Sequence, residues 1–106
     1  MTDLEKEKIE NIADYLGKEE ILCQLSEECG ELIQASLKYR RAAKGLTPVT
    51  VDEAYYNLAE EVGDVLLNIK QILYLFGIDF LKEVEEAESF KANRWWERIN
   101  YGDTLF

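Results

Sequence analysis

The chain has 106 residues, of which 47% are hydrophobic, and this size predicts one compact domain over residues 1–106. Its 22 acidic and 12 basic residues give a net charge of −10, which argues against a nucleic-acid polymer as a partner. The chain contains no histidine, which excludes histidine-based triads, the usual zinc hydrolase sites and the Glu-x-x-His ligands of di-iron bundles.

The first half of the chain predicts two helices. Apolar spacing predicts a short amphipathic helix from Leu4 to Leu16, and Gly17 is expected to end it. A longer helix is predicted from Lys18 or Glu19 to Tyr39, followed by a basic tail that suits the negative end of the helix dipole. The only proline lies in the segment 45–49, which is predicted to be a loop.

The second half predicts two more helices. Thr50-x-x-Glu53 resembles a capping box and opens a third helix that runs to Phe76, where Gly77 ends it. Asp79 is the expected N-cap of a last helix that reaches about Ile99. The sequence thus predicts an all-α fold like a four-helix bundle, with two long central helices. The third helix has a wider apolar arc than one neighbour needs, so we expect a homodimer or homotetramer.

The cellular location and the cysteines also lead to expectations. The first residues lack a secretory signal, and no apolar run approaches the roughly 20 residues of a membrane span. We therefore expect a cytoplasmic protein without a membrane partner. Cys23 and Cys29 lie on one predicted helix, separated by about 9 Å of rise, which is too far for a disulfide.

Two segments of the long helices are near copies of each other. Residues 25–32 read Leu-Ser-Glu-Glu-Cys-Gly-Glu-Leu, and residues 58–65 read Leu-Ala-Glu-Glu-Val-Gly-Asp-Val. Acids on a helix are most often a solvated face, which is the plainest interpretation. The angular positions of these acids around the helix favour a different interpretation. At about 100° per residue, the predicted apolar stripe of the first segment comprises Leu22, Leu25, Cys29, Leu32 and Ser36.

This stripe predicts a shared carboxylate site between the two helices. Glu28 lies at the edge of the stripe with Glu31 beside it, and Glu61 and Asp64 repeat the arrangement. Packing the stripes together would bring the four acids close, where a divalent cation removes their repulsion. An all-carboxylate site favours Mg²⁺, with Mn²⁺ as a substitute.

Each copy also contains a glycine inside its helix. Gly30 and Gly63 occupy equivalent places, at a cost of roughly 1 kcal/mol each relative to alanine. Close approach of helices would explain them, and so would room for a ligand beside the acids.

The paired motifs resemble the signature of the MazG-like all-α nucleoside triphosphate pyrophosphohydrolases, over roughly residues 18 to 98. The resemblance implies cleavage of a nucleoside triphosphate to the monophosphate and pyrophosphate by a metal-activated water, with Mg²⁺ required. The metal ligands that it implies are Glu28, Glu31, Glu61 and Asp64. Glu27 or Glu60 could instead orient the metal-bound water, or support the metal ligands without contacting the metal.

Groups for the rest of the substrate are also expected. Lys91 and Arg94 look like basic residues that the family carries near the end of its last core helix, and they are expected to bind phosphates. Lys38 lies on a face similar to that of Glu31 and could also reach a phosphate. Asn68 follows Asp64 by one turn and is a candidate for hydrogen bonding to the base. Surface or core roles remain open for all four residues.

Two other functions compete with hydrolysis. The main alternative is a non-catalytic helical oligomer that acts as a binding or regulatory module. The other is a carboxylate-bridged iron or manganese redox bundle, which the lack of histidine disfavours.

Overall fold

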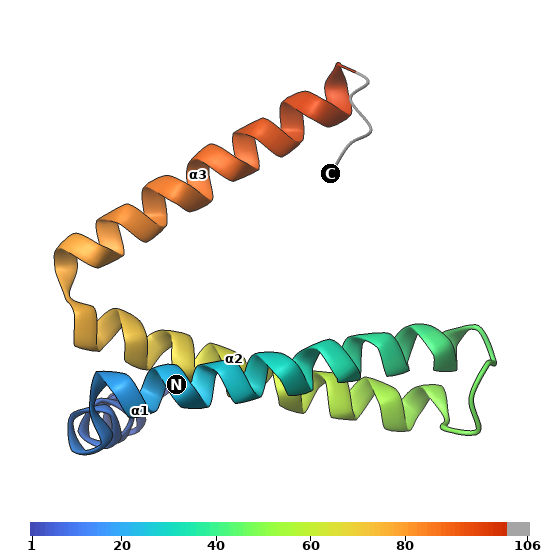
Figure 1. Cartoon of the computed structure of the whole chain (residues 1–106), viewed down its shortest axis with the longest axis horizontal. Coiled ribbons are helices and arrows are strands. Elements are labelled where there is room, and N and C mark those ends of the chain that lie inside the picture. Colours follow the sequence, from blue (N-terminus) through green and yellow to red (C-terminus); the bar gives the residue numbers. More distant parts are fainter. Residues whose placement is uncertain (102–106) are drawn as a thin grey trace. The chain divides into compact units, whose positions relative to one another are not determined.

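A computed structural model describes residues 1–101, and within this range it contains three helices and no strand (Figure 1). Helix α1 spans Asp3–Ala43, α2 spans Val51–Phe76 and α3 spans Ile78–Asn100. The predicted all-α class is confirmed. None of these helices combines the length and the apolar character needed to cross a membrane.

The chain divides into two compact units. The first, Met1–Leu75, contains α1 and nearly all of α2, and the second, Phe76–Phe106, contains α3. Within the first unit, α1 and α2 lie side by side and run antiparallel, joined by the short loop that includes the proline (Figure 1). This helical hairpin positions the acidic motifs. The predicted single domain and the specific MazG-type architecture stay predictions.

Helix α1 is interrupted at Gly17, the residue where the sequence predicts a helix end. Gly17 has φ 84° and ψ 167°, so two helical segments meet there at a kink. Only glycine adopts such a positive φ without strain. The first segment turns away from the rest of α1 (Figure 1). Gln71 and Tyr74 of α2 nevertheless hold it through hydrogen bonds to the Ile9 carbonyl and the Asp14 carboxylate.

The contact between α1 and α2 follows a seven-residue repeat. On α1 it comprises Ile21, Glu28, Ala35 and Ala42, and on α2 it comprises Ala54, Glu61, Asn68 and Leu75, all of them buried or half-buried. A repeat of seven keeps one side of each helix facing its neighbour, as in a coiled coil. We call this line of contact the seam.

The predicted stripe on α1 was wrong at Leu22, whereas its other four members, Leu25, Cys29, Leu32 and Ser36, are half-buried. Leu22 is 42% exposed, whereas Ile21 is completely buried. The two residues lie about 100° apart around the helix. Beyond Gly17, Ile21 and Ala35 are the most deeply buried residues of α1, and they mark the face that meets α2. Glu28 therefore lies within the seam and not at its edge.

Of the two predicted helix caps, at Thr50 and Asp79, one is confirmed and the other is wrong. Thr50 caps α2, because its Oγ1 accepts a hydrogen bond of 3.1 Å from the backbone N–H of Glu53. Asp79 was wrongly predicted as the N-cap of the last helix. That position belongs to Gly77, which has a φ of 92°, and Asp79 falls in the first turn of α3.

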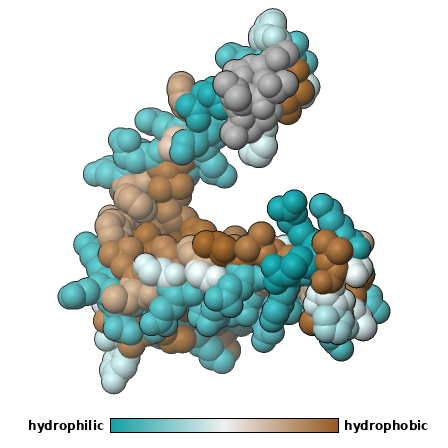
Figure 2. Space-filling view, turned by 45° about the vertical axis from the view of Figure 1, so that its right-hand side comes forward, coloured by the Kyte–Doolittle hydropathy of each residue, from teal (hydrophilic) through white to brown (hydrophobic). Residues whose placement is uncertain are grey.

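Many large apolar side chains of the hairpin remain exposed, and Figure 2 shows a band of them along it. On α2 this exposed apolar stripe comprises Tyr55, Val62, Leu66 and Ile69. The wide apolar arc predicted for this helix is thus present. The oligomer that it implies stays a prediction.

The two motif glycines face away from the seam. Both Gly30 and Gly63 are exposed, and a Cβ added to either would meet nothing within 4 Å. Close approach of α1 and α2 therefore does not explain them, and that prediction was wrong for the hairpin. The alternative explanation, room for a ligand beside the acids, stays a prediction.

Candidate metal centre

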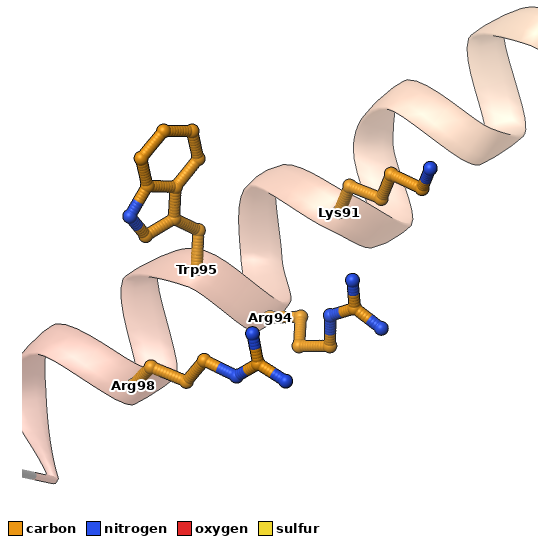
Figure 3. Close-up of a pocket in the computed structure, with 4 residues that line it drawn as sticks. All are labelled: Lys91, Arg94, Trp95 and Arg98. Carbon is orange, nitrogen blue, oxygen red and sulfur yellow. The ribbon is translucent and has the colours of Figure 1, made fainter. Parts of the chain in front are cut away.

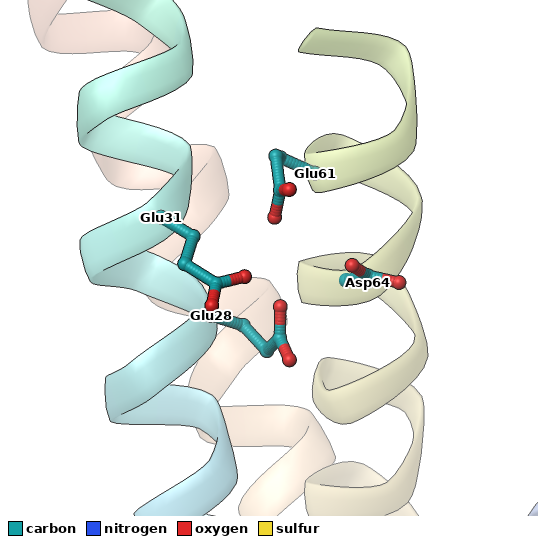
Figure 4. A group of neighbouring side chains, drawn as sticks. All are labelled: Glu28, Glu31, Glu61 and Asp64. Atoms are coloured by element: carbon teal, nitrogen blue, oxygen red, sulfur yellow. The ribbon is translucent and has the colours of Figure 1, made fainter. Parts of the chain in front are cut away.

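Four carboxylates converge between α1 and α2. Glu28 and Glu31 project from α1, and Glu61 and Asp64 project from α2 (Figure 4). One oxygen of each carboxylate lies within 4.8 Å of an oxygen of each of the other three. The structure thus brings together the four residues that the sequence predicted as metal ligands. We call this group the carboxylate cluster.

The cluster arises directly from helix geometry. Side chains three residues apart share one side of a helix, so each motif presents two acids to the same region. Glu28 lies level with Asp64 of the neighbouring helix, and Glu31 lies level with Glu61 (Figure 4). Because the helices are antiparallel, the two near copies of the motif face each other.

Two carboxylate oxygens of the cluster are buried without a partner. Within residues 1–101, neither Glu28 Oε2 nor Glu61 Oε2 has a hydrogen-bond partner, and each is closed to solvent. A buried carboxylate oxygen loses its hydration, and it needs a proton, a hydrogen-bond donor or a cation in return. The protein groups around these oxygens are other carboxylates, which make the loss worse.

The electrostatics of the cluster agree with this description. Burial raises the pKa of Glu28 from 4.5 to about 7, and repulsion from Glu31, Asp64 and Glu61 adds to the increase. Burial also raises the pKa of Glu61, followed by its hydrogen bond with Glu31 and the negative charges nearby. Both shifts oppose full ionisation of the cluster when no cation is bound.

The residues of the cluster fit a hard divalent cation. All four candidate ligands are carboxylate oxygens, the donors that Mg²⁺ and Mn²⁺ prefer. The unpartnered oxygens of Glu28 and Glu61 are the groups that such an ion would satisfy. The set contains no soft donor such as a thiolate. Cys23 and Cys29 are free thiols, Cys23 exposed and Cys29 half-buried, and neither belongs to the cluster.

The other predicted acids lie outside the cluster. Glu27 and Glu60 are both exposed and project from the outer sides of their helices. Glu60 still acts on the site through its charge, because it contributes to the raised pKa of Glu61. A direct role for either residue at the water stays a prediction.

The predicted phosphate-binding residues lie in two places. Lys38 is exposed on α1, two turns beyond Glu31, and is not among the clustered side chains. Lys91 and Arg94 line a hollow on α3 together with Trp95 and Arg98 (Figure 3). The Arg94 guanidinium also lies over the Phe90 ring, 5.7 Å from its centroid. This hollow belongs to the second unit and the carboxylate cluster to the first.

Asn68 occupies the seam position that follows Glu61, and it is only 4% exposed. Its Nδ2 donates a hydrogen bond of 3.1 Å to Gln71 Oε1. Its Oδ1 is buried and has no partner among the described residues. The predicted hydrogen bond to a base stays a prediction.

Gln71 is a residue that the sequence analysis missed. It is 2% exposed, and its Nε2 donates a hydrogen bond of 3.3 Å to the carbonyl of Ile9. The signal was present in the sequence, since Asn68 and Gln71 lie three residues apart in a largely apolar part of α2. Such a pair on a buried face predicts a polar network.

No protein-family description, curated protein or solved structure matches the chain.

Proposed function

We propose that the chain is a Mg²⁺-dependent nucleoside triphosphate pyrophosphohydrolase that releases a nucleoside monophosphate and pyrophosphate. The observation that supports this proposal is the carboxylate cluster, with its two buried and unpartnered oxygens. Four acids held this close without a counter-charge are costly for the fold. A site that requires a cation explains why they are there.

The ligand set leaves room for a polyphosphate. The four carboxylates offer one ligand atom each, which leaves positions of an octahedral ion open for phosphate oxygens and water. When bound, Mg²⁺ lowers the pKa of water and offsets the negative charge of the phosphates. Glu28, Glu31, Glu61 and Asp64 hold the ion, and Glu27 or Glu60 orients the water. No protein nucleophile is required.

The phosphates need further positive charge, and we propose three cations for this purpose. Lys91 and Arg94 present their charges in the hollow on α3 beside Trp95 (Figure 3). Lys38 is the corresponding candidate on α1. A cationic side chain that contacts a phosphate lowers the repulsion between substrate and a chain of net charge −10.

The proposal is tested by a screen for pyrophosphate release. Normal, deoxy and modified nucleoside triphosphates would be supplied with and without Mg²⁺, and Glu61→Gln is the control because it keeps shape and removes one charge. We expect Mg²⁺-dependent release of pyrophosphate that the variant abolishes. Release that survives in Glu61→Gln would remove the cluster from the reaction, and silence across the panel would contradict the proposal.

A second candidate is a non-catalytic binding or regulatory module. The exposed apolar stripe on α2 favours it, because contiguous apolar surface commonly marks a protein interface. This candidate predicts no dependence on Mg²⁺ and tolerance of Glu61→Gln. The same screen therefore separates the two functions.

A further inference from the structure

Three buried side-chain atoms within residues 1–101 have no hydrogen-bond partner, and all three are oxygens. They are Glu28 Oε2, Glu61 Oε2 and Asn68 Oδ1. All three residues occupy the seam between α1 and α2. Buried acceptors without donors are rare in folded proteins, and three in one seam point to one common cause.

Asn68 projects toward the same side of α2 as the metal ligands. It lies seven residues after Glu61, so the two side chains leave the helix within about 20° of each other. It also lies one turn after Asp64. Because side chains lean toward the N-terminal end of their helix, Asn68 leans toward Asp64 and the carboxylate cluster.

The orientation of the Asn68 amide is determined by its partners. The Ile9 carbonyl can only accept a hydrogen bond, so Gln71 must present its Nε2 there. Gln71 Oε1 then faces Asn68 and accepts a hydrogen bond from Asn68 Nδ2. This relay leaves Oδ1 as the free end of Asn68, and reversing the amide would lose a hydrogen bond.

A purely structural asparagine does not account for this arrangement. An asparagine that served only to hold the N-terminal segment would need its Nδ2 alone, and its oxygen would be a loss to the fold. A base-binding role is also disfavoured, since a base would need the Asn68 nitrogen as well, and that nitrogen is already bonded to Gln71. A donor held inside the seam is required.

We propose that Asn68 is part of the cation site, where its Oδ1 accepts a hydrogen bond from water in the hydration shell of the bound divalent ion. Mg²⁺ keeps several of its waters in proteins, and those waters are strong donors. Gln71 acts through Asn68 as a positioning residue. This inference rests on the metal site of the proposed function, and it does not depend on nucleotide hydrolysis.

The test measures cation binding by the whole chain without nucleotide. Mn²⁺ would be titrated into the protein, and free Mn²⁺ would be followed by electron paramagnetic resonance. We expect Asn68→Leu to weaken Mn²⁺ binding by about 10- to 100-fold, the usual effect of losing a group that supports metal ligands. Asn68→Asp keeps an acceptor and should retain binding.

Asn57→Leu is a matched control. Asn57 lies one turn before Glu61, as Asn68 lies one turn after Asp64, and it is half-buried without an unpartnered buried atom. This variant should bind Mn²⁺ like the unmodified chain. Thermal unfolding provides a second measurement: it checks that metal-free Asn68→Leu is folded, and added Mn²⁺ should raise the melting temperature of this variant by less than that of the unmodified chain.

The outcomes are distinguishable. Weaker binding in Asn68→Leu alone, with a folded metal-free protein, supports the inference. Equal Mn²⁺ affinity in Asn68→Leu and the unmodified chain overturns it and leaves the metal site intact. If the unmodified chain binds no Mn²⁺, both the inference and the metal site of the proposed function are wrong.

Discussion

Cation binding by the carboxylate cluster should depend steeply on pH. Glu28 has a pKa of about 7 because it is buried among other acids. A cation must compete with the proton on this carboxyl, since metal ligands bind in their deprotonated form. Above pH 7 the competition disappears, and below it the apparent affinity falls about tenfold per pH unit.

The expected magnitude follows from this single ionisation. Between pH 8 and pH 5, a group with a pKa of about 7 weakens cation binding by about 100-fold. Glu61, whose pKa is also raised, can only steepen the dependence. Titration with Mn²⁺ at four pH values between 5 and 8 measures the slope, and calorimetry in buffers of different ionisation enthalpy counts the protons released.

Glu28→Gln is the control for this prediction. It removes the titrating group, so it should bind Mn²⁺ more weakly at pH 8 and lose part of the dependence on pH. An affinity in the unmodified chain that is equal at pH 5 and pH 8 would refute the reasoning. It would mean that Glu28 is not a ligand, or that its carboxyl is ionised in the folded chain across this whole range.

The metal-free protein should show the opposite response in its stability. The raised pKa means that folded chains retain a proton on Glu28 that unfolded chains release. Stability without metal therefore falls as pH rises from about 4.5 to about 7. Urea unfolding in the presence of a chelator checks the sign, and an increase in stability through this window would contradict the burial of Glu28.

Further substitutions test other parts of the structure. Gly30→Ala and Gly63→Ala should each stabilise the chain by about 1 kcal/mol in urea unfolding, because both sites are helical and the added methyl group meets nothing within 4 Å. A loss of stability would show that another surface packs against these positions. Asp64→Asn should abolish pyrophosphate release and raise the melting temperature of the metal-free protein, because it relieves repulsion within the cluster; retained turnover would exclude Asp64 from the mechanism. Light scattering should detect a dimer or tetramer that Leu66→Glu shifts toward monomers, since Leu66 is 50% exposed on the apolar stripe of α2. A monomeric unmodified chain would contradict the expected oligomer.

The sequence predicted the carboxylate cluster better than it predicted the packing around it. The spacing of Glu28 with Glu31, and of Glu61 with Asp64, depends only on helix periodicity and on the pairing of adjacent helices. Those rules are local, and they located all four acids correctly. The repeat of the motif in antiparallel helices then brought the copies together.

The seam could not be read from apolar spacing alone. Hydrophobic size favours a stripe through Leu22, whereas the helices meet along Ile21 and Ala35. Small residues such as Ala35 allow close contact, and several larger apolar side chains, such as Leu22, stay exposed. An apolar pattern in a sequence gives most importance to large side chains. It does not show which of two apolar faces of a helix contacts the neighbouring helix.

The role of Asn68 depends on a relay that no local rule predicts. Its partner Gln71 is nearby in sequence, but the carbonyl that orients Gln71 belongs to Ile9, 62 residues away from Gln71. The misplaced N-cap at Asp79 has a simpler cause. Side-chain preference favours aspartate, but α2 and α3 are separated by a positive φ that glycine tolerates best, and this places the N-cap at Gly77.

The kink at Gly17 separates the two parts of α1, so the angular positions of side chains before Gly17 do not determine those after it. In an unbroken helix, adding or removing one residue would rotate everything on one side of the change by about 100° relative to the other. At Gly17 the phase starts again, so residues 3–16 meet α2 with a face of their own. The N-terminal segment can therefore vary in length or angle without turning Glu28 and Glu31 out of the seam, and what it must preserve is the hydrogen bond from Gln71 to the Ile9 carbonyl.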